Sequence, residues 1–226
     1  MAKLDPTTKA NWQKAQEAEK GHWAWLWQAA DSEDRKQLIN SETIKGEFIF
    51  QEMVEHFDIR PKTDWAKKNI LDVGCGPLSI VARHGPGETR TGVDPLHYPT
   101  WVYEDYEAQD FKVLMLPFEE LDTKTKYDVI VFYNALQHFA DLSLVAKTCQ
   151  DLLSKNGSVF LSEYLRVPTN DAHIQFLEKD TLDRHFESTG LSVDSVTKSV
   201  RLPGYVERPD GSAIDLYIAR LKLNNS

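Results

Sequence analysis

Cysteine is scarce in this sequence, and long apolar runs are missing. Cys75 and Cys149 are the only cysteines in 226 residues, which is too few for a disulfide framework and indicates a reducing compartment. No run reaches the ~18 apolar residues of a membrane-spanning helix. The start, MAKLDPTTKANWQ, lacks the apolar core of a secretory signal. We therefore expect a cytoplasmic protein that does not span a membrane.

Positive charge is also in short supply. Lysine and arginine number 26 against 35 acidic residues, giving a net charge of −9. This balance disfavours broad electrostatic capture of nucleic acid or of an anionic membrane surface. Metal motifs are absent, since there is no C-x-x-C, no H-E-x-x-H and no dense carboxylate cluster. We expect no metal and a small-molecule partner, and the sequence carries no signal of oligomeric state.

What is present is a regular alternation of short apolar runs and helical segments. The apolar runs lie at 69–73, 90–93, 112–116, 127–133 and 157–163. Such alternation predicts an α/β fold with a parallel sheet covered on both faces. Two longer alternating stretches, 191–201 and 213–222, predict an antiparallel hairpin added to that sheet.

Helices are expected before and between these strands. Residues 7–57 look helical and 58–68 read as a connector, so we divide the chain into a helical cap, 1–60, and a main domain, 61–226. A helix is predicted to start after the N-cap Asp141, with Lys155 in its last turn and Gly157 as its stop. A second helix fits 181–189, closed by Gly190.

The stretch NILDVGCGPLSI predicts a nucleoside-binding loop. Gly74 and Gly76 follow a strand and let the backbone approach a ligand, and a helix starting there offers free N–H groups. The third position of the dinucleotide fingerprint is Ser79 rather than glycine. Asp72 would repel a pyrophosphate and attract a cationic ligand. Asp94 ends the next strand, where a carboxylate can accept hydrogen bonds from ribose hydroxyls.

Five segments in order carry a family resemblance. ILDVGCGPLS, TGVDP, MLPFEEL, YDVIVFYNALQHFAD and LLSKNGSVFLSEYL resemble the successive motifs of class I S-adenosylmethionine-dependent methyltransferases. The resemblance covers roughly 69–163. It implies a Rossmann-like seven-stranded sheet of order 3-2-1-4-5-7-6 with a reversed last strand, S-adenosylmethionine as cofactor, and methyl transfer as the reaction.

The resemblance also assigns cofactor contacts by position. At the methionine end it implies backbone contacts from Gly74, Cys75 and Gly76, with Asp72 near the amino group. Tyr133 and Asn134 are implied to face the sulfonium and the methyl group.

At the nucleoside end, the resemblance implies that Asp94 takes the ribose hydroxyls and that Pro95 and Leu96 flank the adenine. Phe118 would offer its backbone N–H to the ring. The family often has aspartate before that position, where this chain has Pro117, and Glu119 is the candidate substitute.

Three side chains are candidates for a general base, which matters when the acceptor is a hydroxyl. His138 follows the fourth strand, His173 lies in the loop after the fifth strand, and Glu163 ends the fifth strand. Each has a structural alternative, in which His138 packs and caps a loop and Glu163 bonds a backbone group.

The segment GHWAWLWQ is the least expected part of the chain. On a helix, Trp23 and Trp27 share one face and Trp25 points the opposite way. This face either packs against the domain or forms a lid over the cofactor. In the second case Trp23, Trp27 and Gln137 would line the acceptor pocket.

Three functions remain open from the sequence. The first is methylation of an O or N atom of a small molecule, with a sugar or polysaccharide precursor suggested by a loose resemblance in AEKGHWAWL, GVDPLHY and NALQHFAD. The second is a nucleic-acid or protein methyltransferase, although YNALQ lacks the Asn-Pro-Pro-Tyr type motif used for base amines. The third is a non-catalytic partner-binding fold, against which the intact glycines and Asp94 argue.

Overall fold

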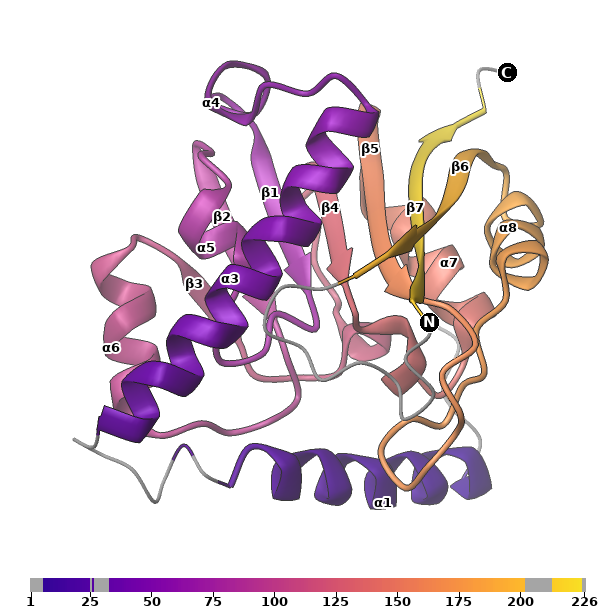
Figure 1. The fold of residues 1–226 in the computed structure, drawn as a ribbon. Helices are drawn as coiled ribbons and strands as arrows, with labels where there is room; N and C mark the ends of the chain where they lie inside the picture. Colours follow the sequence, from indigo (N-terminus) through magenta and orange to yellow (C-terminus); the bar gives the residue numbers. More distant parts are fainter. Residues whose placement is uncertain (1–5, 25, 27–32, 202–212, 225–226) are drawn as a thin grey trace.

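A seven-stranded sheet of order β3-β2-β1-β4-β5-β7-β6 forms the centre of the molecule (Figure 1). The computed structural model describes residues 6–24, 26, 33–201 and 213–224. β7 runs antiparallel to β5 and β6, and the other neighbours are parallel. The expected α/β fold and strand order are confirmed. The strands are β1 (Asn69–Val73), β2 (Thr89–Val93), β3 (Lys112–Leu114), β4 (Tyr127–Tyr133), β5 (Leu153–Tyr164), β6 (Leu191–Val200) and β7 (Ile214–Leu223).

Helices cover both faces of the sheet, and each face has its own core. On one face, α3 (Glu33–His56), α5 (Ile80–His84) and α6 (Thr100–Ala108) pack against alternate strand residues such as Val129 and Phe160. On the other, α7 (Leu142–Leu152) and α8 (Lys179–Glu187) pack against the intervening residues, such as Ile130. Burial on both faces explains why the strands are nearly continuous apolar runs.

The two N-terminal helices, α1 and α3, lie at different places on the sheet. Helix α1 (Pro6–His22) runs across the end of the sheet to which the arrows of β1 and β4 point (Figure 1). Helix α3 instead contributes Ile49 and Met53 to the core of one face. The expected helical character of 7–57 is confirmed for these two helices. Trp25 and Trp27 lie outside the described residues, and the division at residue 60 stays a prediction.

Three short helices complete the description. They are α4 (Pro61–Asp64), η1 (Phe118–Glu120) and η2 (Leu136–His138). None of the helices in the described ranges combines the length and the apolar character needed to cross a membrane.

The junction between α7 and β5 corrects the sequence-based boundary. Asp141 caps α7 as predicted, since its carboxylate accepts hydrogen bonds from the backbone N–H of Ser143 and Leu144. The helix ends at Leu152, however, and Lys155 and Gly157 belong to β5. Leu153 already pairs with Tyr127 of β4. A Cβ on Gly157 would lie 2.9 Å from the Tyr127 carbonyl oxygen, so this glycine permits close strand approach and is no helix stop.

Gly190 does terminate a helical segment as predicted. It has φ of +84°, a left-handed conformation that glycine adopts without cost. Helix α8 begins at Lys179, two residues before the expected start.

Candidate active site

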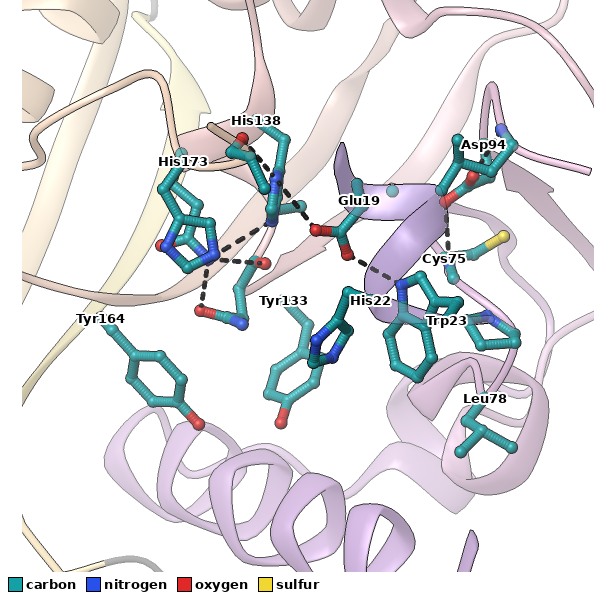
Figure 2. Close-up of a pocket in the computed structure, with 18 of the residues that line it drawn as sticks. Glu19, His22, Trp23, Cys75, Leu78, Asp94, Tyr133, His138, Tyr164 and His173 are labelled. Atoms are coloured by element: carbon teal, nitrogen blue, oxygen red, sulfur yellow. Dashed lines mark hydrogen bonds and ion pairs between the residues drawn. The ribbon is translucent and has the colours of Figure 1, made fainter. Parts of the chain in front are cut away.

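A cavity of about 1110 Å³ opens at the carboxyl ends of the parallel strands, beneath α1. Ligands of open α/β sheets bind at this edge. The lining comes from helices α1, α3 and α5 and from the segments that follow β1, β2, β3, β4 and β5. Figure 2 shows part of it. Because pockets for one ligand usually enclose about 300–1,000 Å³, this cavity has room for a cofactor and a small acceptor together.

The loop after β1 is preformed by its neighbours. Gly74 has φ of +68°, and a Cβ there would lie 2.7 Å from the Cβ of Ala135. Only glycine fits both the conformation and the space. The hydroxyl of Tyr106, on α6, donates to the Gly76 carbonyl at 2.6 Å and accepts from the Ser79 N–H at 2.9 Å. Gly74, Cys75 and Gly76 all line the cavity, and their contact with the methionine part of a cofactor stays a prediction.

Asp94 joins this loop to the end of β2. Its Oδ2 accepts the Gly76 N–H at 2.9 Å, and its Oδ1 accepts the Leu96 N–H at 2.9 Å and the Tyr98 hydroxyl at 3.1 Å. A carboxylate has about four acceptor positions, so at least one is left for a hydroxyl in the cavity. Burial raises the pKa of Asp94 to about 6, and the donors from Leu96 and Gly76 partly offset that rise.

Asp72 lies under the loop and is not among the cavity-lining residues. Its Oδ2 accepts the Ser79 hydroxyl at 2.5 Å, and Ser79 in turn caps α5 by accepting the Ala82 N–H. Burial raises the pKa of Asp72 to about 7. In this geometry Asp72 holds the loop in place, and its contact with a cofactor amino group remains a prediction.

The residues expected to hold an adenine come together at another wall of the cavity. Pro95, Leu96, Phe118 and Glu119 all line it. The carboxylate of Glu119 is buried, and no described side chain bonds to it. Burial raises its pKa to about 7, partly offset by the backbone amides of Glu119 and Ala140. An exocyclic amine placed here would supply the donor that no described side chain provides.

The acceptor side of the cavity contains the other predicted residues. Tyr133, Asn134, Gln137, His138, His173 and Trp23 line it. The rings of His138 and His173 lie 4.9 Å apart between centroids. Burial lowers the pKa of both imidazoles, and Glu19 opposes the effect. His138 is therefore neutral at pH 7, as a general base must be.

Glu163 does not reach the cavity. It is fully buried, and its Oε1 accepts the backbone N–H groups of Ala135 and Leu136 at 3.1 and 3.2 Å. The structural alternative for this residue matches its position. It supports the loop that carries Asn134, Gln137 and His138, and it acts through that loop rather than on a substrate.

We expect Glu163→Gln to flatten the pH dependence of stability. Burial raises the pKa of Glu163 to about 8 from an ordinary 4.5, so between these values the folded chain binds a proton that the unfolded chain has lost. The free energy of unfolding then falls as pH rises, by at most about 1.4 kcal/mol per pH unit for this group. Glutamine keeps the accepting oxygen and removes the titration.

Chemical denaturation at pH 5, 6, 7 and 8 measures this difference. The wild-type free energy of unfolding should fall more steeply than that of Glu163→Gln. Glu88→Gln, at an exposed position, serves as the control and should follow the wild type. Parallel curves for all three proteins would show that Glu163 is not buried as a neutral acid.

Several cavity residues were missed by the sequence reading. Glu19, on α1, lies between His138 and Trp23 (Figure 2). Trp12, on α1, and Trp23, in the turn just after it, also line the cavity. Trp12 precedes Glu19 by seven residues, and Trp23 follows it by four. This spacing was a usable signal in the sequence, because residues so spaced lie on one face of a helix. Tyr164 and Arg166, at and just beyond the end of β5, also line the cavity.

Three side chains in the cavity are of the types that bind metal ions. Among the residues that the structure describes, Glu19, His138 and His173 each offer one ligand atom, all within 4.8 Å of one another. The Nδ1 of His138 lies 3.1 Å from the Ala172 carbonyl oxygen. A carbonyl can only accept, so this nitrogen carries a hydrogen. A cation could use the nitrogen only after displacing that hydrogen.

Comparison with known proteins agrees with this geometry. Residues 46–196 match a family model described as a methyltransferase domain, and the sheet has the strand order of that fold. The chain belongs to the class I S-adenosylmethionine-dependent methyltransferases. Ubiquinone biosynthesis O-methyltransferases are among its relatives. The Acinetobacter baumannii protein is 29% identical over 140 residues, covering 53% of this chain and 57% of the relative. The Pseudomonas entomophila protein is 30% identical over 125 residues, covering 49% and 54%.

Solved structures extend the likeness of this methyltransferase over most of its length. A Burkholderia thailandensis 1,6-didemethyltoxoflavin-N1-methyltransferase, solved with its substrate and S-adenosylhomocysteine, has a TM-score of 0.64 at 16% identity. The alignment covers 99% of this chain and 93% of that one. The N-methyltransferase NodS of Bradyrhizobium japonicum has a TM-score of 0.56 at 12% identity, covering 82% and 98%. At such identities the likeness shows the fold. The chain spans about half the length of the curated relatives it matches.

Proposed function

We propose that this protein transfers a methyl group from S-adenosylmethionine to a hydroxyl oxygen of a small molecule. The observation that carries the proposal is a single cavity with different functional groups at its two ends. Gly74, Gly76 and Asp94 form a nucleoside-binding edge, and His138 offers a neutral imidazole at the other end. Both buried cysteines are free, which fits the reducing cytoplasm proposed from composition.

The residues of the cavity fit the cofactor. The glycine loop exposes backbone at the methionine end, Asp94 retains an acceptor position for a ribose hydroxyl, and Glu119 lacks a side-chain partner at the adenine end. When bound, S-adenosylmethionine supplies an already activated methyl group. Catalysis by the chain then consists of aligning the acceptor, excluding water and receiving a proton.

The tautomer of His138 suits proton removal. Because Nδ1 carries a hydrogen towards the Ala172 carbonyl, the neutral ring leaves Nε2 with its lone pair. Gln137 lies 3.4 Å from this Nε2 through its amide nitrogen. A base in this position favours a hydroxyl acceptor over a neutral amine, which needs no proton removal before attack.

A panel of acceptors tests the proposal. The relatives named ubiquinone biosynthesis O-methyltransferases support an oxygen acceptor, for which phenols are simple probes. The tryptophans on the cavity wall support a sugar, whose apolar face can stack on an indole ring. Purified protein with radiolabelled S-adenosylmethionine is offered phenols, sugar nucleotides and primary amines. We expect label in a phenol or a sugar. Label in amines alone would contradict the hydroxyl assignment.

We expect Glu119→Ala to weaken S-adenosylhomocysteine binding by about tenfold. The change removes the acceptor for the adenine amine and leaves that donor unpaired, which costs about 1–3 kcal/mol. Glu120→Ala is a matched control, because Glu120 is the next residue and is half-exposed in a pair with Lys9. Calorimetric titration of both variants measures the ratio. Equal affinities for the two would place the adenine elsewhere.

A further inference from the structure

Glu19, on α1, lines the cavity and has no role in the function proposed above. Its side chain is only 16% exposed and lies between α1 and the loop after β4. Its Oε1 accepts the indole N–H of Trp23 at 2.8 Å, and its Oε2 lies 3.8 Å from the Nδ1 of His138 (Figure 2). One oxygen is thus fixed by a partner in the turn just after α1, while the other faces the candidate base.

The hydrogen on His138 Nδ1 lies between two acceptors. The Ala172 carbonyl, from the loop that follows β5, is 3.1 Å away, and the Glu19 carboxylate approaches from α1. The Ala172 hydrogen bond fixes the tautomer and the ring orientation, and the Glu19 carboxylate, beyond hydrogen-bond distance, acts on the ring through its charge. A carboxylate beside this N–H also stabilises the imidazolium that forms when Nε2 takes a proton.

We propose that Glu19 is the positioning residue for His138, and that Trp23 fixes Glu19 in that role. This inference rests on the proposed function. It gives α1 a part in the chemistry, because the carboxylate reaches the imidazole only when the helix lies across the cavity.

The reaction step balances with this pair. The acceptor oxygen forms a bond to the methyl carbon, and the carbon–sulfur bond breaks with its electron pair going to sulfur. The hydroxyl proton moves to Nε2 of His138. The positive charge that leaves the sulfonium therefore reappears on the imidazole, beside the carboxylate of Glu19.

The titratable groups around His138 come from two segments. Glu19 and His22 are on α1, and His173 is on the loop after β5. Burial and the charge of His22 lower the pKa of His138, whereas Glu19 and the hydrogen bond to the Ala172 carbonyl raise it. Removing the carboxylate while keeping its shape should therefore make His138 harder to protonate.

Histidine titration by NMR tests this inference without an acceptor. Protein labelled at the histidine ring carbons is titrated from pH 4.5 to 8.5 as wild type, Glu19→Gln and Glu17→Gln. Glu17 is the matched control, since it lies two residues away on the same helix with a side chain 77% exposed. We expect the His138 midpoint to move to lower pH in Glu19→Gln and to stay in place in Glu17→Gln. The same midpoint in all three proteins would overturn the proposal.

Trp23→Phe is a second variant in case Glu19→Gln disturbs the helix. It keeps an aromatic ring and removes the indole donor to Glu19. We expect a shift in the same direction but smaller, and no shift would show that Trp23 does not hold the carboxylate. With an acceptor in hand, Glu19→Gln should lower kcat about tenfold and leave the S-adenosylhomocysteine affinity unchanged.

Two further outcomes distinguish this inference from the proposed function and from a metal site. Failure of the wild type to bind S-adenosylhomocysteine would sink the proposed function, whereas the NMR shift would still report the Glu19–His138 contact. Stoichiometric binding of added Zn²⁺ that abolishes the titration of His138 and His173 would overturn the positioning role in favour of a metal site.

Discussion

Asp94→Ala is expected to weaken S-adenosylhomocysteine binding by about 100-fold or more. The side chain accepts the Gly76 N–H, the Leu96 N–H and the Tyr98 hydroxyl while it is buried at the mouth of the cavity. Alanine removes the acceptor for the two ribose hydroxyls and leaves each of them unpaired in the complex, at about 1–3 kcal/mol for each. Since 1.4 kcal/mol is a factor of ten, two such losses reach the expected change.

Two other variants make this result specific. Asp94→Asn keeps one accepting oxygen, and its affinity for S-adenosylhomocysteine should fall by about tenfold. Asp128→Asn changes an aspartate near the amino end of β4, away from the cavity, where its carboxylate accepts hydrogen bonds from the Asn69 N–H and the Ser154 hydroxyl. It should lower stability and leave the affinity unchanged. Affinity lost equally in Asp128→Asn and Asp94→Ala would mean that general destabilisation, and not ribose binding, causes the effect.

His138→Ala is expected to lower kcat by about 10²- to 10⁴-fold on the acceptor found in the panel, which is the usual contribution of a general base. The affinity for S-adenosylhomocysteine should be unchanged, because the glycine loop and Asp94 do not contact this ring in the described structure. Added imidazole should restore part of the rate by filling the space left by the side chain. Steady-state kinetics with calorimetry on the same variant give both numbers.

His173→Ala and His185→Ala serve as comparisons. His173 faces His138 in the cavity, and His173→Ala should lower kcat less than His138→Ala does. His185 lies on α8 and contacts Ser143 outside the cavity, so His185→Ala is the control. A large loss in His173→Ala together with a small loss in His138→Ala would exchange the roles of the two histidines.

The sequence predicts much of the fold and of the cofactor edge because their signals are local. Strand runs, the glycine spacing and an acid after the second strand are each fixed by neighbouring residues. The prediction that a helix ends within Leu153–Gly157 was wrong, because LSKNG has the composition of a helix end but forms a strand. Pairing of Leu153 with Tyr127, across 26 residues of sequence, decides its conformation.

Glu19 could not be assigned from the sequence because its role depends on how α1 docks. A glutamate on a polar helix is ordinarily a solvated residue. Only the tertiary structure brings it to His138, 119 residues later in the chain. The same holds for Glu163, whose place at the end of β5 suggested chemistry. Its side chain turns into the protein and holds the backbone of Ala135 and Leu136.

Titration of the purified wild-type protein with S-adenosylhomocysteine tests the central claim most directly. We expect one molecule bound per chain with micromolar affinity. At 100 times the dissociation constant this binding adds about 2.7 kcal/mol of stability, which raises Tm by roughly 5–10 °C for a chain of this size. No heat of binding and an unchanged Tm at millimolar ligand would contradict the account and leave a methyltransferase fold that does not use this cofactor.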